Sequence, residues 1–196
     1  QVKERFQIPI ITDIHEPWQA KPISEVADIL QIPAFLCRQT DLLQAACETQ
    51  NMLLIKKMQM MSPLEMKNII QKCQTFANEN IILCERGSSF GYNNLIVDPL
   101  SFPQLKKFGK PVCFDVSHAL QQPGGLGTRT SGRGQFVQDL ALAGLSQQIS
   151  SLFVEFHPNP AQAKCDGPCA MPLSQASDFL KKAKQLDSLV KSWISE

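Results

Sequence analysis

The stretch Asn80-Glu-Asn-Ile-Ile-Leu-Cys-Glu-Arg-Gly-Ser-Ser-Phe-Gly-Tyr92 contains the pattern that decides the fold. Its apolar run, residues 81–84, is long enough for one buried strand. The run ends in Glu85 and Arg86, which a Gly/Ser loop follows. A guanidinium binds a carboxylate or phosphate with two parallel hydrogen bonds, and glycine lets the backbone approach a ligand closely. Taken alone, the stretch is better explained as an ordinary strand-to-loop junction, but the same layout recurs along the chain.

Short apolar runs followed by polar residues occur six times. They predict strands at residues 7–15, 34–37, 52–55, 81–84, 112–116 and 151–154. At or just beyond their ends stand Asp13 and His15, Arg38, Lys56, Glu85 and Arg86, His118, and Glu155. Helical patterns lie between them, at 23–30, 42–49, 62–77, 102–107, 136–148 and 173–194, and a mobile Gly/Pro/Ser/Thr-rich loop is expected at 121–134. Strands that alternate with helices predict a parallel α/β sheet.

The position of the charged residues favours a barrel over an open sheet. In a (β/α)8 TIM barrel all strand ends converge on one face, which carries the active site. A doubly wound open sheet instead gathers its ligand-binding residues at one crevice. A closed barrel has eight strands and usually about 250 residues, whereas this chain has 196 residues and six predicted strands. We therefore expect either that two βα units are missing at the N-terminus or that the sheet is not closed.

Composition and charge exclude several classes of protein. The chain is 43% apolar, enough to bury one core, so residues 1–196 are expected to form a single domain. A net charge of +1 without a basic block argues against nucleic acid as a partner. No apolar run approaches the ~20 residues of a membrane helix, and residues 1–6 contain no signal-peptide core. Most of the seven cysteines lie inside apolar patterns, which indicates reduced thiols in a cytoplasmic protein.

Five motifs spread over essentially the whole chain resemble one known family. They are Thr12-Asp-Ile-His-Glu-Pro17, Ile32-Pro-Ala-Phe-Leu-Cys-Arg-Gln-Thr-Asp-Leu42, Ile82-Leu-Cys-Glu-Arg-Gly-Ser-Ser-Phe-Gly-Tyr92, Phe114-Asp-Val-Ser-His-Ala-Leu-Gln121 and Lys164-Cys-Asp-Gly-Pro168. Together they resemble the 3-deoxy-D-manno-octulosonate 8-phosphate (KDO 8-phosphate) synthase family. The resemblance implies a (β/α)8 barrel of the aldolase type, with about six βα units in this chain and the first two missing.

The resemblance also implies an activity. Members of this family are transferases that condense phosphoenolpyruvate with D-arabinose 5-phosphate and water, giving KDO 8-phosphate and inorganic phosphate for lipopolysaccharide biosynthesis. They are usually homotetrameric. Because parts of both substrate sites belong to the first two units of the family's barrel, we expect this 196-residue chain alone to be inactive or nearly so.

Several residues at the strand ends match substrate-binding positions of the family. By the resemblance, Lys56, Gln59 and Arg86 bind phosphoenolpyruvate, while Asp13 and Arg38 lie where the sugar phosphate would bind. Lysine supplies a point charge and arginine a planar fork for such anions. In the family the enol C3 attacks the aldehyde while water adds at C2, and phosphate leaves by C–O cleavage. We expect cationic groups aimed at the developing charge to be the main catalytic contribution, followed by positioning of the two substrates.

His118, Glu155 and Asp166 are the catalytic candidates, and the resemblance leaves two roles open for them. They match the three metal ligands of metal-dependent members. In metal-independent members the same residues hold and polarise a water molecule. The 164–168 motif resembles the metal-independent subclass, so we expect no cofactor, with a divalent metal at these three residues as the alternative.

Other interpretations of the sequence are weaker. Cys165 and Cys169, with His157 nearby, could suggest a zinc site, but their spacing fits no usual structural zinc site. His15 is interpreted as structural. The alternative enzymatic function is that of 3-deoxy-D-arabino-heptulosonate 7-phosphate synthase, a related barrel that uses erythrose 4-phosphate. The non-enzyme alternative is a non-catalytic remnant that only binds a ligand or another subunit. Measuring which aldose phosphate is used distinguishes the two enzymatic functions. Calorimetry with phosphoenolpyruvate distinguishes a remnant that binds this ligand from one that does not.

Overall fold

The fold is built on one parallel six-stranded sheet. The computed structural model describes residues 1–125, 127 and 130–193. The strands of the sheet are β1 (Ile11–Asp13), β2 (Ile29–Ile32), β3 (Met52–Lys56), β4 (Ile81–Glu85), β7 (Val112–Asp115) and β10 (Ser151–Phe153). They stand in the sheet in the order of the chain, and every neighbouring pair is parallel. A doubly wound sheet has a point at which the strand order reverses. The sheet therefore has the strand order of a barrel.

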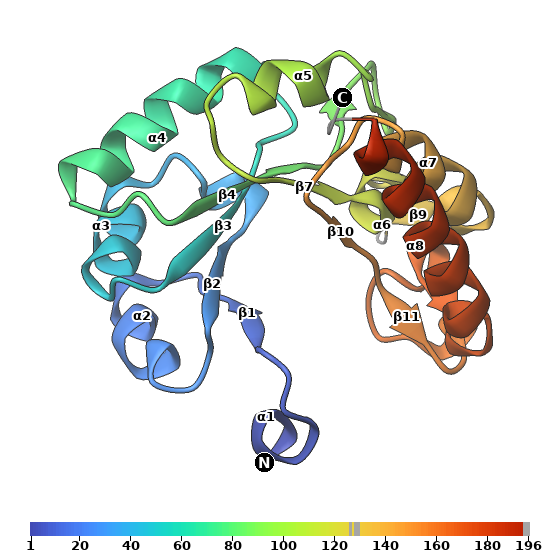
Figure 1. The fold of residues 1–196 in the computed structure, drawn as a ribbon, viewed down its shortest axis with the longest axis horizontal. Coiled ribbons are helices and arrows are strands. Elements are labelled where there is room, and N and C mark those ends of the chain that lie inside the picture. Colours follow the sequence, from blue (N-terminus) through green and yellow to red (C-terminus); the bar gives the residue numbers. More distant parts are fainter. Residues whose placement is uncertain (126, 128–129, 194–196) are drawn as a thin grey trace.

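Helices cover the outer face of the curled sheet (Figure 1). They are α2 (Pro17–Ser24), α3 (Thr40–Glu48), α4 (Met66–Thr75), α5 (Ser101–Lys106), α7 (Val137–Leu145) and α8 (Ala176–Ser192), with the short α1 (Val2–Phe6) before β1 and α6 (Val116–Ala119) after β7. Sheet and helices form an arc whose ends stand apart (Figure 1), and β1 and β10 are the edge strands of the described sheet. This α/β architecture fits an aldolase-type barrel that is open between β10 and β1.

Three small two-stranded ladders lie in the segments that follow β4, β7 and β10. They are β5 (Ser88–Ser89) with β6 (Leu95–Ile96), β8 (Gln121–Gln122) with β9 (Ser131–Gly132), and β11 (Phe156–His157) with β12 (Met171–Pro172). Short 3-10 turns occupy residues 34–36, 63–65, 134–136, 160–162, 167–169 and 173–175. In the described part of the chain, no helix combines the length and apolar character needed to cross a bilayer.

The predicted order of elements is wrong at one place near the start of the chain. Residues 23–30 were expected to form a helix, but α2 ends at Ser24 and strand β2 begins at Ile29. Residues 34–37 were expected to form the second strand, but they form a 3-10 turn and its cap. The remaining predicted strands and helices exist, with ends shifted by a few residues.

Local chemistry explains this shift. Glu16 and Gln19 form a reciprocal capping box and Pro17 occupies the first turn, so α2 begins earlier than its apolar pattern indicates. Pro33 cannot donate a backbone hydrogen bond, and β2 ends just before it. The apolar residues of the segment after Pro33 therefore fill a turn instead of a ladder.

Two predictions extend beyond the described residues. The loop predicted at 121–134 includes positions 126, 128 and 129, and its described residues include the β8–β9 ladder. The mobility of that loop stays a prediction. The last helix, predicted at 173–194, reaches Ser192 in α8, and position 194 lies outside the described residues.

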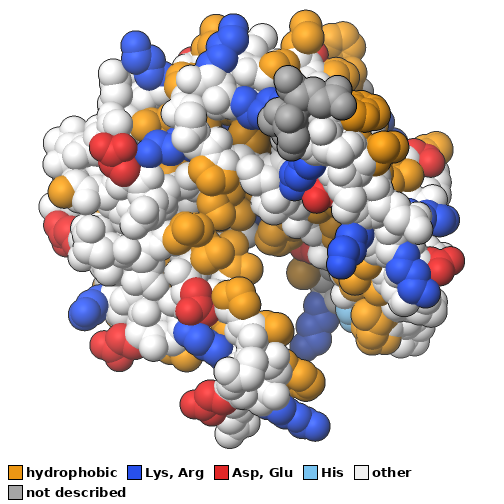
Figure 2. All heavy atoms as spheres, viewed as in Figure 1, with side chains coloured by type: hydrophobic (Ala, Val, Ile, Leu, Met, Phe, Trp, Pro, Cys, Tyr) orange, Lys and Arg blue, Asp and Glu red, His pale blue; other side chains and the backbone are white. Residues whose placement is uncertain are grey.

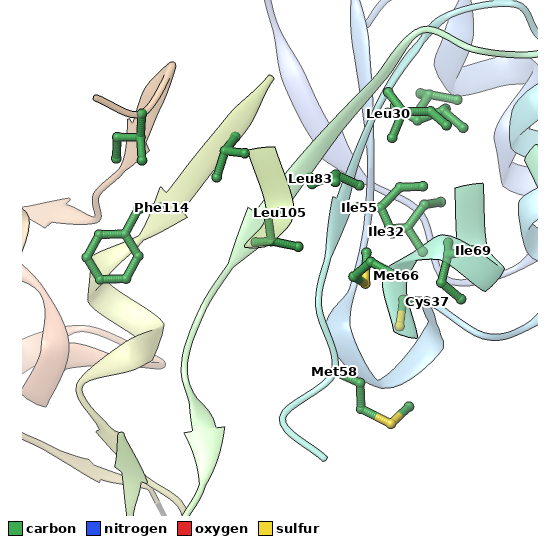
Figure 3. Close-up of a cluster of buried hydrophobic side chains, with 14 of the residues drawn as sticks. Leu30, Ile32, Cys37, Ile55, Met58, Met66, Ile69, Leu83, Leu105 and Phe114 are labelled. Carbon is green, nitrogen blue, oxygen red and sulfur yellow. The ribbon is translucent and has the colours of Figure 1, made fainter. Parts of the chain in front are cut away.

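Alternate strand side chains form the main core between the sheet and the helices. Successive residues of a strand point to opposite faces, and Ile55 of β3, Leu83 of β4 and Phe114 of β7 are fully buried in the main cluster. Figure 3 shows these side chains together with Met66 and Ile69 of α4. This layer fixes the helices on the outside of the arc.

The opposite, inner face of the sheet carries a smaller apolar cluster. It consists of Leu54, Cys84 and Cys113, with Ile29, Ile82 and Phe153 packed against it. The two-residue alternation places Lys56 beyond Leu54 and Asp115 beyond Cys113 on this face. Charged groups therefore stand directly above an apolar floor. In Figure 2 hydrophobic side chains gather along the open side of the arc, next to β1–β4. All seven cysteines are free and six are buried, which agrees with reduced thiols.

The close packing of α7 on β7 gives a test of this core. A Cβ added at Gly144 would lie 2.9 Å from Cε1 of Phe114 and closer still to Cδ1. Helix propensity alone would make Gly144→Ala stabilising by about 1 kcal/mol, whereas such overlap costs about 1–3 kcal/mol. We expect urea unfolding to show a net destabilisation of up to roughly 2 kcal/mol.

Two controls accompany this measurement. Ala143→Gly, on the exposed side of the same helix, measures the propensity contribution by itself. Phe114→Leu in the Gly144→Ala background should recover part of the loss because it removes ring atoms from the overlap. A Gly144→Ala protein that is more stable than the original would contradict the packing described.

Candidate active site

The carboxyl ends of the strands meet around a cavity of about 230 Å³. Its polar lining is Asp13, Gln31, Lys56, Gln59, Arg86, His118, Gln121 and Asp166. Six of the eight site residues predicted from the sequence belong to this set. A seventh, Glu155, lies 3.3 Å from His118 through Oε1 and Nε2. Residues far apart in the sequence are therefore brought to one place by the convergence of the strands.

Lys56 lies at the edge of the cavity in a buried ion pair. Its Nζ is 2.7 Å from Oδ2 of Asp115 and 3.9 Å from the centroid of the Phe153 ring. The Lys56 side chain is 7% exposed and that of Asp115 is fully buried. A cation above an aromatic face gains about 0.5–2 kcal/mol. Two independent contacts thus hold the ammonium group in place.

Arg86 presents an unpaired donor to the cavity. This side chain is only 4% exposed, and its Nη2 donates a hydrogen bond of 2.6 Å to Oε1 of Gln121. Its Nη1 is buried without a hydrogen-bond partner among the described residues, as is Oε1 of Gln59. Burial lowers the pKa of Arg86, while the negative charge of Asp115 acts in the opposite direction, and a guanidinium keeps its proton in either case. An unpaired buried donor costs about 1–3 kcal/mol, so this geometry suits an anionic ligand.

Asp115 orients His118. Its Oδ1 accepts the backbone N–H of His118 at 3.0 Å and faces Nδ1 of the same residue at 2.9 Å. Burial alone would raise the pKa of Asp115, but the hydrogen bond from His118 and the charge of Lys56 outweigh it, and the pKa is lowered. A carboxylate that holds Nδ1 fixes the ring and turns Nε2 toward the site.

His118, Glu155 and Asp166 form one cluster. Each offers a ligand atom, and these atoms lie within 4.8 Å of one another. Burial raises the pKa of Glu155; the charge of His118 opposes this, and that of Asp166 adds to it. One imidazole and two carboxylates at this spacing can hold a divalent cation or a polarised water molecule.

Gln121 connects this cluster to Arg86. Its Nε2 donates to Oδ1 of Asp166 at 2.5 Å, while its Oε1 accepts from Arg86. Asp166 also borders a second hollow of about 540 Å³, lined by residues 160–161, 163–168 and Thr130. The side-chain amide of Gln121 thus joins the cationic half of the site, Lys56 and Arg86, to the acidic half, the cluster of His118, Glu155 and Asp166.

One predicted site residue lies elsewhere, and His15 was expected to be structural. Arg38 is exposed, just before α3, and is not among the residues that line the cavity. His15 is exposed and lies 3.4 Å from Asp13 through Nε2 and Oδ2. Cys165 is exposed and Cys169 is buried. Neither they nor His157 belong to the metal-ligand cluster of the described residues.

Sequence reasoning missed Asp115 and Gln121. Asp115 was counted as part of an apolar strand at 112–116. The available signal was its position three residues before His118, the spacing at which an aspartate caps a helix. Gln121 has no such local signal because only the tertiary fold brings it between Arg86 and Asp166.

Comparison with known proteins agrees with this architecture. The model of the DAHP synthetase I family matches residues 1–192. Relatives from Pseudomonas aeruginosa (strain UCBPP-PA14), Stutzerimonas stutzeri (strain A1501) and Psychromonas ingrahamii (strain DSM 17664 / CCUG 51855 / 37) are 55%, 56% and 55% identical over 193 residues. In each case the match covers 98% of this chain and 69% of the relative, and all three are named 2-dehydro-3-deoxyphosphooctonate aldolase. The chain therefore belongs to the DAHP synthetase I family.

Proposed function

We propose that this protein is a KDO 8-phosphate synthase, a transferase that condenses phosphoenolpyruvate with D-arabinose 5-phosphate and water. The products are KDO 8-phosphate and inorganic phosphate, and the pathway served is lipopolysaccharide biosynthesis. The observation that carries the proposal is the buried Nη1 of Arg86, which has no partner among the described residues and lines the same strand-end cavity as Lys56. The names of the relatives point to the eight-carbon product.

In this proposal the cationic half of the cavity binds phosphoenolpyruvate. Arg86 pairs with its carboxylate or phosphate, Lys56 supplies a second positive charge, and Gln59 adds an amide contact. A substrate with several negative charges needs such compensation in a site that excludes water. The same groups stabilise charge that moves onto the departing phosphate during C–O cleavage.

The acidic half of the cavity faces the water that adds at C2. Nε2 of His118 lies 3.3 Å from Oε1 of Glu155, and Asp166 belongs to the same cluster. We assign to these three residues the positioning of that water and the transfer of its proton. Asp13 lines the cavity and is proposed to contact the sugar phosphate, whose phosphate would extend outward to the exposed Arg38.

Cofactor use is proposed to follow the metal-independent subclass. The three residues fit a divalent cation by donor type and spacing, and a bound cation would supply a polarised water at that position. The resemblance of the 164–168 motif to metal-independent members supports the water alternative instead.

Oligomer formation is the remaining part of the proposal. Phe35, Met60 and Phe90 are 70%, 77% and 68% exposed. The backbone N–H of Ser89 donates to the carbonyl of Gln59 at 2.9 Å, so the segments that carry Met60 and Phe90 are neighbours. Exposed apolar patches of this kind mark interaction sites. We propose a homo-oligomer, with a homotetramer expected, in the reducing cytoplasm that free cysteines suit. A closed eight-stranded barrel would also need two further βα units between β10 and β1.

Calorimetry with phosphoenolpyruvate tests the proposed anion site. We expect saturable binding by the wild-type protein and a loss of affinity of roughly tenfold to a hundredfold in Arg86→Met, because a buried charge-assisted contact contributes about 1.5–3 kcal/mol. Lys182→Met, which removes a lysine on the exposed face of α8, is the control. Absence of binding by wild-type protein would contradict the proposed function.

The sugar substrate is tested by turnover. Loss of the enolpyruvate absorbance should be faster with arabinose 5-phosphate than with erythrose 4-phosphate, since the relatives are named for the octonate product. Faster turnover with erythrose 4-phosphate would assign the alternative heptulosonate reaction. Robust turnover by the 196-residue chain by itself would contradict the expectation that this chain alone is inactive.

The metal alternative is tested by titration with Mn²⁺ after treatment with a chelator. We expect no saturable micromolar binding and no change in phosphoenolpyruvate affinity upon chelation. Saturable Mn²⁺ binding that disappears in His118→Ala would assign a metal centre to His118, Glu155 and Asp166.

A further inference from the structure

Lys57 is one of the largest fully buried side chains in the described part of the chain. It follows Lys56 directly, and because side chains alternate along an extended segment, it points away from the cavity that Lys56 borders. A buried ammonium group is costly unless several partners compensate it. The proposed substrate contacts do not explain why a second lysine is buried here.

The partners of Lys57 come from two different loops. Its Nζ lies 3.4 Å from the carbonyl of Met58 and 3.1 Å from that of Met61, in the turn after β3. It also lies 3.0 Å from Oγ of Ser88 and 3.5 Å from the carbonyl of Gly87, in the segment after β4. One ammonium group therefore joins the loops that follow two neighbouring strands.

Glu85 extends this connection to the backbone of Arg86. Its Oε1 is 3.5 Å from Nζ of Lys57 and accepts the backbone N–H groups of Arg86 at 3.0 Å and Gly87 at 2.7 Å. Gly87 has a φ of +86°, a conformation that residues with a side chain rarely adopt. The carboxylate thus holds the sharp turn through which the chain passes just after Arg86.

The two joined loops carry two of the proposed phosphoenolpyruvate-binding residues. Gln59 stands between Met58 and Met61, and Arg86 stands between Glu85 and Gly87. The carbonyl of Gln59 also accepts the backbone N–H of Ser89 at 2.9 Å. Among the residues that the structure describes, Nη1 of Arg86 and Oε1 of Gln59 are buried without a hydrogen-bond partner. Their relative position is therefore set from behind the cavity by Lys57 and Glu85.

We infer that Lys57 and Glu85 are positioning residues for anion binding, acting through Arg86 and Gln59 without touching the substrate. The inference rests on the proposed function, because phosphoenolpyruvate is the anion concerned. Placing the guanidinium of Arg86 and the side-chain amide of Gln59 before binding lowers the cost of ordering them. Loosening the loops should weaken binding of phosphoenolpyruvate and leave arabinose 5-phosphate binding unchanged.

The test measures phosphoenolpyruvate affinity by calorimetry in Lys57→Met, Glu85→Gln and Ser88→Ala. Circular dichroism first identifies a temperature at which each variant is folded. We expect dissociation constants raised about tenfold in Lys57→Met and Glu85→Gln, and about threefold in Ser88→Ala, which removes a single partner of Nζ. Lys110→Met is the matched control because Lys110 also pairs with a glutamate, Glu79, at 3.2 Å. Both residues precede the amino ends of β7 and β4, whereas the cavity lies at the carboxyl ends of the strands.

A double-mutant comparison separates positioning from a general structural effect. Ser88→Ala removes one partner of Lys57. If Lys57 acts through the guanidinium of Arg86, this variant should lose much less affinity for phosphoenolpyruvate in an Arg86→Lys background than in the wild type. Equal losses in both backgrounds, or dissociation constants within about twofold of wild type for folded Ser88→Ala and Glu85→Gln, would overturn the inference. Failure of the wild-type protein to bind phosphoenolpyruvate would instead remove the proposed function itself. Should Lys57→Met not fold, the other two variants decide.

Discussion

The buried ion pair between Lys56 and Asp115 is the interaction on which the candidate site depends. Lys56 ends β3 and Asp115 ends β7, so the pair reaches across β4, where Cys84 lies level with Lys56. A small side chain at that position leaves room for the contact. Removing one partner of a buried pair typically costs about 3–5 kcal/mol because the other charge stays buried. Asp115 also orients His118, and the pair thereby links the cationic half of the cavity to the acidic half.

Much of the fold follows from sequence pattern alone. Apolar runs ending in charge predicted a parallel sheet whose ends converge, and Lys56, Arg86, His118 and Asp166 do border one cavity. The prediction works because strand direction in a parallel sheet is uniform, so every carboxyl end reaches the same edge. The roles of these residues came from resemblance to a family, since spacing alone could not bring together groups that stand far apart in the chain.

The features that could not be predicted from the sequence were missed for physical reasons. The second strand was misplaced because a short apolar run fits a strand and a turn equally well, and the capping box at Glu16 outweighed the periodicity. Gln121 was missed because its partners, Arg86 and Asp166, are brought to it only by tertiary packing. Asp115 was missed because its local capping of the turn at His118 was hidden inside a run interpreted as an apolar strand. Arg38 follows a predicted strand that is a turn, and its side chain lies outside the cavity lining.

The apolar floor beneath the charged residues has a consequence for the effect of dissolved salt. Leu54, Cys84 and Cys113 lie under Lys56 and Asp115, and Arg86 is almost inaccessible to solvent. Mobile ions screen exposed charges over about 8 Å at physiological ionic strength, but they act much less on groups that water does not reach. Attraction between this site and an anion should consequently persist at salt concentrations that abolish binding to surface lysines.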